Sequence, residues 1–519
     1  MKPIPVIDLF AGPGGLGEGF SSITNRNGDP LFKIGLSIEK DSNARQTLHL
    51  RAFFRQFRRD RVPEEYYDYL AGKIPRNQLW SCHKAEAKAA DSEAWHAELG
   101  GDSTPDEAVD ERISRTLAGR RDWLLIGGPP CQAYSVVGRS RVIGAEGLAK
   151  YEADPRHGLY RHYLRIIRKH RPAVFVMENV KGLLSAKIGQ LKTFDRILDD
   201  LRDPELAITG KSRSGSEYRL FPLASRNLDV FEAAKPEDFV VRAEEHGIPQ
   251  SRHRIIIVGI RGDIIAKPRP LNGRGSALGV EEVIGDLPRV RSGLSRETDS
   301  ADAWVKVVRS IAGSEWMKPK GVPGKVIREI RAALRDLEQN AGCGAEFIPH
   351  RSGPAVLRDW FQDDRLLGVT NHSARSHMAA DLHRYLFAAS FAKVTGKTPF
   401  LGDFPAAILP EHGNVAESLE TKKFKDRFRV QLRDRPATTV VSHISKDGHY
   451  FIHYDPTQCR SLTVREAARL QTFPDNYHFE GVRTEQYHQV GNAVPPLLAR
   501  LIAEVVAEVF GLSYEGVKW

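Results

Sequence analysis

The chain has 519 residues, of which 41% are hydrophobic and 27% charged, and its formal net charge at pH 7 is +10. This length is too great for one compact core and predicts at least two domains, and the composition is that of a soluble globular protein. No apolar run approaches the ~20 residues of a membrane span. The basic balance favours a polyanionic partner, because each neutralised phosphate releases counterions.

Cysteine usage indicates a reducing compartment. The four cysteines are scattered through the chain without a CxxC pair: Cys82, Cys131, Cys343 and Cys459. This spacing argues against a disulfide framework or a zinc site. The first residues lead directly into a strand pattern, so we expect no signal or transit peptide. The sequence therefore predicts a cytoplasmic protein that uses no metal.

The first half of the chain alternates apolar strands with helical stretches. The predicted strands are residues 6–10, 33–41, 123–130, 173–180 and 254–260. Continuous apolar strands separated by helices are typical of a parallel sheet that is covered on both faces. Ligands bind to such sheets beyond the carboxyl ends of the strands. The polar motifs described below lie at those ends or just past them.

The pattern changes after the fifth strand. A Pro- and Gly-rich stretch, 267–279, reads as a linker, and it is followed by a predicted helix at 324–339 and a predicted strand at 435–444. Further helices are expected at 462–474 and, with an amphipathic pattern, at 494–511. Thr463 and Glu466 have the spacing of a capping box at the start of the first of these. We interpret residues 262–455 as a separate, smaller domain.

A basic, aromatic-bearing run, RAFFRQFRRDR, occupies residues 51–61. It is either a solvated helix face or a set of phosphate contacts.

A glycine-rich turn follows the first strand, in DLFAGPGGLGEGF (8–20). It lacks the GxGxxG spacing of dinucleotide folds and the Lys-Ser/Thr of a P-loop, so it is either a turn that needs positive φ or a close approach of ligand to backbone. Glu39 ends the second strand, where a carboxylate can accept hydrogen bonds from ribose hydroxyls or simply face solvent. Asp102 lies in a loop before the third strand.

The motif GGPPCQAYS (127–135) places a thiol at the carboxyl end of the third strand. A thiolate is the strongest side-chain nucleophile at neutral pH. A single cysteine is usually buried and inert, but the flanking glycines, prolines and polar residues disfavour burial of Cys131. Glu178 ends the fourth strand, where a carboxyl group can hydrogen-bond or protonate a ring nitrogen. Arg252 and Arg254, in QSRHR (250–254), lie at the start of the fifth strand, where either could also be a surface residue or a salt-bridge partner.

Six motifs in order resemble the cytosine-5 DNA methyltransferase family: DLFAGPGG, GGPPCQAYS, ENV, QSRHR, RSLTVREAARLQTFPD and QVGNAVPP. The resemblance implies an α/β fold, a Rossmann-like class I S-adenosylmethionine-dependent methyltransferase sheet with a smaller target-recognition domain. It divides the chain into a catalytic domain (1–261), a target-recognition domain (262–455), a hinge (456–485) and a C-terminal helix returning to the catalytic domain (486–519).

The resemblance also implies residue roles. The cofactor site would contain Phe10, Gly12, Gly14, Glu39, Asp102, Pro129, Asn492 and Val494. Cys131 matches the nucleophile, Glu178 the residue that grips the cytosine edge, and Arg254 the contact to cytosine O2, with Arg252 close by. The DNA contacts would be Gln132, Ser135, Arg139 and Arg141. Two features depart from the family pattern: Lys40 replaces the aromatic that follows the ribose-binding acid, and the segment between Glu39 and Asp102 is long.

The function implied is transfer of a methyl group from S-adenosylmethionine to C5 of a flipped-out cytosine in double-stranded DNA, through a covalent Cys131–C6 adduct. A monomer in the bacterial cytoplasm, in a restriction-modification system with a cognate endonuclease, is the expected setting. The alternatives are an RNA (tRNA) cytosine-5 methyltransferase, a catalytically inactive DNA-binding module and a nicotinamide dehydrogenase. The RNA enzymes resemble this chain but have a shorter middle region with a CFT motif, which this sequence lacks.

Overall fold

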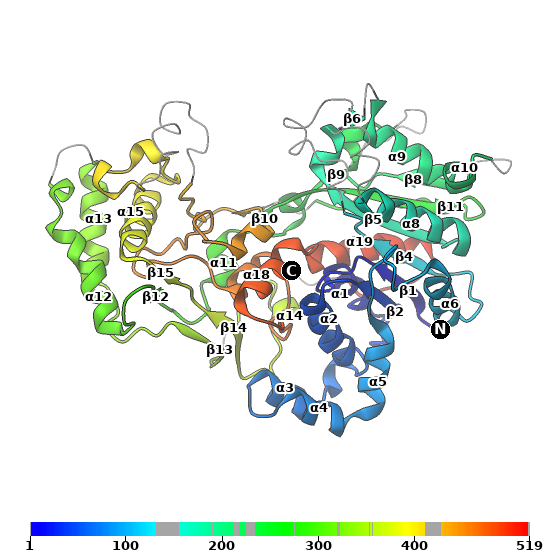
Figure 1. The fold of residues 1–519 in the computed structure, drawn as a ribbon, viewed down its shortest axis with the longest axis horizontal. Helices are drawn as coiled ribbons and strands as arrows, with labels where there is room; N and C mark the ends of the chain where they lie inside the picture. Colours follow the sequence, from blue (N-terminus) through cyan, green and yellow to red (C-terminus); the bar gives the residue numbers. More distant parts are fainter. Residues whose placement is uncertain are drawn as a thin grey trace.

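A large mixed sheet organises the first half of the chain (Figure 1). The computed structural model describes residues 2–130, 155–185, 187–188, 191–211, 217–224, 234–273, 276–318, 322–351, 353–354, 356–410 and 427–516. The strand order is β3-β2-β1-β4-β5-β11-β8, with β9 also paired to β11. The strands are β1 (Ile4–Leu9), β2 (Phe32–Glu39), β3 (Ala94–His96), β4 (Leu124–Gly127), β5 (Val174–Val180), β8 (Tyr218–Phe221), β9 (Val240–Arg242) and β11 (His253–Arg261).

All five predicted strands of the first half are confirmed, but the direction of the last is not. Strands β3, β2, β1, β4 and β5 run parallel, whereas β11 runs antiparallel to β5, β8 and β9. The prediction of a wholly parallel sheet was therefore wrong at residues 254–260. A strand that is buried on both faces has the same apolar pattern in either direction, so the sequence does not encode this choice.

Helices cover both faces of the sheet, and β1 contributes alternate side chains to two cores. Val6 joins the core beneath α1 (Gly15–Ser21) and α19 (Pro496–Val509). Ile7 and Leu9 join the opposite core. That core is closed by α6 (Asp106–Leu117), α8 (Pro155–His170) and α9 (Thr193–Arg202). This two-sided burial is what the continuous apolar strands predicted.

Helix α19 differs from its expected amphipathic form. Twelve of its fourteen residues are buried, because it packs against α1 and joins one core of the sheet rather than lying on the surface. Of the described residues, the stretch Arg483–Val509 is apolar and long enough to match a membrane span, and 94% of its most apolar window is buried in the fold. Such burial is typical of a core helix.

A further hydrophobic core, separate from the two that cover the sheet, belongs to residues 294–459. Helices α12 (Ala301–Arg309), α13 (Gly324–Arg335) and α15 (Ala379–Thr395) lie at one end of the molecule, with the large sheet at the other (Figure 1). Short strand pairs adjoin these helices: β12 (Gly293–Leu294) with β15 (Ser376–His377), and β13 (Gly344–Pro349) with β14 (Gly368–Ser373). The predicted helix at 324–339 is thus confirmed by α13.

The two ends of the molecule are joined by short elements. The predicted strand at 435–444 shrinks to β16 (Ala437–Thr438), which pairs with β10 (Gln250–Ser251) before the chain turns into η11 (Ser442–Ser445). Helices α11 (Val280–Ile284), α14 (Arg358–Phe361), α17 (Val464–Leu470) and α18 (Arg483–Asn492) complete the junction. The predicted capping box is confirmed: Glu466 N donates to Thr463 Oγ1 at 3.2 Å, and Thr463 N donates to Glu466 Oε2 at 2.7 Å.

The segment between Glu39 and Asp102 forms a helical lobe. It comprises α2 (Ser42–Phe54), α3 (Glu64–Leu70), α4 (Arg76–Cys82) and α5 (Lys84–Glu93). Arg51 forms a buried ion pair with Glu18 at 2.5 Å, and Arg55 pairs with Glu93 at 2.5 Å. These two arginines are neither part of a solvated helix face nor free to contact phosphates. Both interpretations of the basic run were therefore wrong for Arg51 and Arg55. Only its end, from Arg58 to Arg61, is exposed.

Helix α3 ties this lobe to the rest of the chain through three tyrosine hydroxyls. Tyr66 donates to Asn476 O at 3.0 Å, Tyr67 to Asp363 Oδ2 at 2.8 Å, and Tyr69 to Glu480 Oε1 at 2.7 Å. Asn476 Nδ2 also donates to Asp363 Oδ2, at 2.6 Å. The acceptors lie 296 to 411 residues away in the sequence, so the lobe braces the sheet domain against the junction.

Tyr67→Phe tests this brace. We expect the free energy of unfolding to fall by about 1.5 kcal/mol, because the charged, half-buried carboxylate of Asp363 loses the hydrogen bond that the Tyr67 hydroxyl donates. Urea unfolding followed by circular dichroism measures the change. Lys73→Gln, which removes an exposed ion pair with Asp68 on the same lobe, is the control and should leave stability unaltered. Equal stability of Tyr67→Phe and the wild-type protein would contradict a bracing role.

Candidate active site

The carboxyl ends of β1 and β2 meet at a carboxylate. Glu39 Oε2 accepts a hydrogen bond from Gly12 N at 2.7 Å, and Oε1 accepts one from Asp41 N at 2.8 Å. Burial raises the pKa of Glu39, although these two backbone donors oppose the shift. A carboxylate has about four lone-pair positions, so acceptor capacity remains for hydroxyl groups of a ligand. The structure thus brings predicted residues Gly12 and Glu39 together.

The glycine-rich turn is enclosed on one side and open on the other. Gly14 has φ +99°, and a Cβ there would lie 2.8 Å from Leu48 Cδ1 and 2.9 Å from the Tyr477 hydroxyl. Gly12 has φ +56°, and a Cβ there would meet no atom of the described residues within 4 Å. Tyr477 also hydrogen-bonds to the Pro13 carbonyl, which fixes the turn. The open side at Gly12 is where a ligand can approach the backbone.

The C-terminal motif packs directly on this turn. The Val494 carbonyl oxygen lies 2.2 Å from the position that a Cβ of Gly15 would occupy, and Val494 is buried. Asn492 ends α18 with an exposed side chain that lies 3.4 Å from His488. Phe10, the last residue before the turn, adopts a left-handed φ of +57°. The fold therefore gathers Phe10 and Val494 around the glycine-rich turn.

Asp102 is exposed in a turn after β3. Strand β3 ends at His96, which is in register with Glu39, and Ala97 N donates to the Glu39 carbonyl at 3.0 Å. Lys40, which follows Glu39, forms an exposed ion pair with Glu98 at 3.3 Å. Asp102 follows the strand next to Glu39, but no contact among the described residues joins the two side chains. The assignment of Asp102 to the cofactor site stays a prediction.

A second polar cluster lies at the end of β5. Arg254 Nε lies 2.8 Å from Glu178 Oε1, and both side chains are close to nine-tenths buried. Arg254 Nη1 also donates to the His253 carbonyl at 2.8 Å. Strands β5 and β11 are antiparallel, so the end of one and the start of the other meet at the same edge of the sheet. The pair provides an acceptor and a donor side by side in a partly desolvated place.

The Gly-Gly-Pro-Pro turn after β4 lies against this pair. A Cβ at Gly128 would lie 2.8 Å from Glu178 Oε2. Asn179 Nδ2 donates to the Pro129 carbonyl at 3.0 Å, which fixes the chain two residues before Cys131. Sequence reasoning missed Asn179, although its place beside Glu178 in the ENV motif is a signal for it. Five predicted residues, Cys131, Gln132, Ser135, Arg139 and Arg141, lie outside the described part of the chain.

Arg252 is fully enclosed and bonds to three backbone carbonyls. Its guanidinium donates to Val440 O at 2.6 Å, Gly491 O at 3.3 Å and Ala493 O at 2.8 Å. Only 1% of its surface is exposed. These bonds hold the chain near β16 and the C-terminal motif to the sheet domain. The structure thus places Arg254, and not Arg252, beside Glu178.

The sequence is similar to those of known proteins over 74% to 97% of this chain. The type II methyltransferase M.Bpa9945I of Bacillus paralicheniformis is 33% identical over 97% of this chain and 98% of its own length. The type II methyltransferase M.AgeI of Thalassovita gelatinovora is 27% identical over 74% of this chain and 82% of its own length. The DNA (cytosine-5-)-methyltransferase M.ApeKI of Aeropyrum pernix is 26% identical over 76% of this chain and 82% of its own length.

The sequence also matches the family described as C-5 cytosine-specific DNA methylase, over residues 101–208 and 237–508. These segments cover more than half of the chain and include Glu178, Arg254 and the C-terminal motif. The chain belongs to the C-5 cytosine-specific DNA methylase family.

Proposed function

We propose that this methyltransferase methylates C5 of a cytosine in a specific double-stranded DNA sequence by covalent catalysis at Cys131, and that it protects DNA in a restriction-modification system. The observation that carries the catalytic part is the Glu178–Arg254 pair, 2.8 Å apart, against the turn that leads to Cys131. A cytosine ring offers N3 to one of these groups and O2 to the other.

The residues at the ends of β1 and β2 fit S-adenosylmethionine. The Glu39 carboxylate, held by two backbone donors, would accept the ribose hydroxyls, and the open side of Gly12 admits the ligand to the backbone. Phe10, Gly14, Pro129, Asn492 and Val494 would form the surrounding wall, with Asp102 toward the adenine. The cofactor, once bound, supplies the methyl group to be transferred.

The chain's own side chains prepare the acceptor. Cytosine C5 is too weak a nucleophile to take a methyl group unaided, and attack of the Cys131 thiolate on C6 makes C5 enamine-like. Glu178 stabilises or protonates N3 as charge enters the ring, and Arg254 fixes O2. Loss of the C5 proton and departure of Cys131 then restore the aromatic ring. Because the ring faces are blocked in duplex DNA, the cytosine must leave the stack, which costs a few kcal/mol.

Other parts of the chain have supporting roles in this proposal. Residues 1–261 form the catalytic domain, 262–455 the target-recognition domain, 456–485 the hinge and 486–519 the returning C-terminal helix. The separate hydrophobic core within 294–459 supports this division. Gln132, Ser135, Arg139 and Arg141 would contact the DNA, whereas Arg252 positions the junction through its carbonyl bonds. We further propose a monomer in the bacterial cytoplasm, with a cognate endonuclease acting on the same site and no metal.

Transfer of a labelled methyl group from S-adenosylmethionine to duplex DNA and to tRNA tests the proposal. We expect incorporation into duplex DNA and none into tRNA, and bisulfite sequencing of the product should show one recurring sequence around the modified cytosines. Incorporation into tRNA alone would refute the DNA assignment.

Paired glycine substitutions test the cofactor site. Gly14→Ala should lower the free energy of unfolding by about 3 kcal/mol, because positive φ and a blocked Cβ position both oppose a side chain. Gly12→Ala should cost only about 1 kcal/mol, since its Cβ position is open. The same Gly12→Ala change should weaken S-adenosylmethionine binding about tenfold, because the added methyl group would occupy the space through which the ligand reaches the backbone. Calorimetric titration measures the affinity, and an unchanged value for Gly12→Ala would place the cofactor elsewhere.

A further inference from the structure

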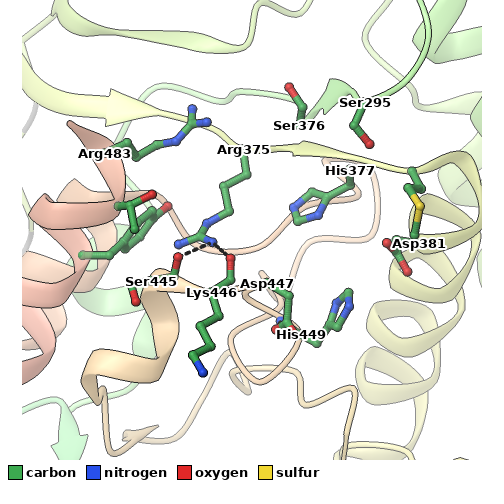
Figure 2. A pocket seen from close by; sticks show the side chains of 13 residues that line it. Ser295, Arg375, Ser376, His377, Asp381, Ser445, Lys446, Asp447, His449 and Arg483 are labelled. Atoms are coloured by element: carbon green, nitrogen blue, oxygen red, sulfur yellow. Dashed lines mark hydrogen bonds between the residues drawn. The ribbon is translucent and has the colours of Figure 1, made fainter. Parts of the chain in front are cut away.

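A polar cavity of about 410 Å³ lies away from the Glu178–Arg254 pair, where the second domain meets the junction (Figure 2). Its walls come from the end of β15, from the chain that follows η11, and from the first turn of α18. Ser295 and Ser376 lie on one side, and Lys446 and His449 on the other (Figure 2). Nothing in the catalytic proposal above uses these residues.

Three cations line this cavity, and no ion pair within the described part of the chain neutralises them: Arg375, Lys446 and Arg483. Arg375 is 8% exposed, and its terminal nitrogens donate to the carbonyls of Ile444, Ser445 and Lys446. Its Nε is buried without an acceptor among the described residues. Arg483 donates to the Ala374 carbonyl at 2.6 Å, and Lys446 is exposed at the rim.

The acids at the cavity offset these charges only in part. Asp381 is paired with Arg384 at 2.7 Å. Asp447 is exposed and accepts a hydrogen bond from His449 N at 3.0 Å, which leaves its charge in place, so three cations face one carboxylate without an ion-pair partner among the described residues. Burial lowers the pKa of the His377 ring to about 3, and the neighbouring His449, Arg375 and Arg483 contribute to the same shift. In addition, α18 begins at Arg483 without a side-chain cap, so its first N–H groups add partial positive charge. The cavity is therefore built to receive an anion.

The chain path relates this cavity to the reacting edge of the sheet. Arg252 donates to the Val440 carbonyl, and Arg252 is two residues from Arg254. Ser445, in the cavity wall, follows Val440 by five residues, which span at most ~17 Å. The other wall, α18, runs from the cavity to Asn492 and the motif that packs on the glycine-rich turn. A short path along the chain therefore connects the cavity to the strand that carries Arg254.

We propose that this cavity holds one backbone phosphate of the DNA substrate, a few nucleotides from the methylated cytosine. The inference rests on the proposed function for the presence of the substrate. A phosphodiester carries one negative charge on oxygens that accept from guanidinium, ammonium, hydroxyl and backbone N–H donors, all of which the cavity provides. Such a contact carries no sequence information; it fixes the register of the DNA on the protein.

Charge removal at the rim tests the proposal. Lys446→Gln, Arg483→Gln and the double variant would be titrated with a duplex that contains a site methylated by the wild-type protein. For the double variant we expect about tenfold weaker binding near 0.1 M salt, and a plot of log K against log salt that is less steep by about one unit. Lys306→Gln, which removes an exposed charge from α12 in the same domain, is the matched control and should change neither value.

Neutral methylphosphonate linkages, introduced one at a time within about six nucleotides of the cytosine, locate the phosphate. One linkage should weaken DNA binding by the wild-type protein about tenfold. The same linkage should change DNA binding by the double variant less than about twofold, because that variant already lacks the positive charges that would contact the phosphate. The proposal would be overturned if the double variant bound DNA with the affinity and salt dependence of the wild-type protein. It would also be overturned if every linkage weakened DNA binding equally in both proteins. Methyl transfer by the wild-type protein to the same duplex tests the proposed function separately.

Discussion

Cys131→Ser is expected to lower methyl transfer to duplex DNA by roughly three or more orders of magnitude. A serine hydroxyl is almost wholly protonated at neutral pH and cannot replace a thiolate as the nucleophile at C6. Without the covalent bond, C5 is not activated. The affinity for S-adenosylmethionine should stay within about twofold of the wild type, because the assigned cofactor residues are unchanged.

Single-turnover assays with labelled cofactor measure the rate, and calorimetric titration measures cofactor binding. Cys82→Ser is the matched control, since Cys82 is an exposed free thiol on α4 and should be dispensable. Transfer by Cys131→Ser at a rate near that of this control would remove Cys131 from the role of nucleophile.

Glu178→Gln has the second largest expected effect, a loss of about 10² to 10⁴ in the rate of methyl transfer. The amide keeps the shape of the carboxylate but cannot carry the charge or the proton that N3 requires as the ring accepts electrons. The substitution also leaves Arg254 without the carboxylate that lies 2.8 Å away, in a place where both side chains are largely buried. Binding of S-adenosylmethionine should be retained, because Glu39 and the glycine-rich turn are on other strands.

Rapid-quench measurement of one turnover separates this effect from DNA binding. Glu111→Gln, an exposed carboxylate on α6 that pairs with Arg115, provides the control. If Glu178→Gln turned over as fast as Glu111→Gln, the contact to N3 would be misassigned.

The sequence predicts five strands of the sheet domain, but not the direction of β11 or the presence of the other, short strands. Apolar runs such as residues 173–180 and 254–260 became β5 and β11 because burial on both faces demands such runs. The short strands β3, β8 and β9 contain only three or four residues and lack a pattern of their own. Their pairing depends on longer neighbours, so no local signal could reveal them.

Some residues of the candidate site can be predicted from the sequence and others cannot. The sequence predicts two pairings: Glu39 with the glycine-rich turn, and Glu178 with Arg254. Each of these residues lies at the end or the start of a recognisable strand. Arg252 differs, because its role depends on carbonyls 188 to 241 residues away in the sequence. The ion pairs of Arg51 and Arg55 likewise need Glu18 and Glu93, which only the folded chain brings near. The roles of these side chains depend on partners that are distant in the sequence, and spacing along the chain does not identify those partners.

The covalent step is open to one direct measurement. A duplex that carries 5-fluorocytosine at the methylated position is incubated with the protein and S-adenosylmethionine, then separated under denaturing conditions. Fluorine at C5 cannot leave as a proton does, so the bond between Cys131 and C6 should persist and the DNA should migrate with the protein, but not with Cys131→Ser. Absence of a trapped complex with the wild-type protein, at a position that it methylates when ordinary cytosine is present, would contradict covalent catalysis.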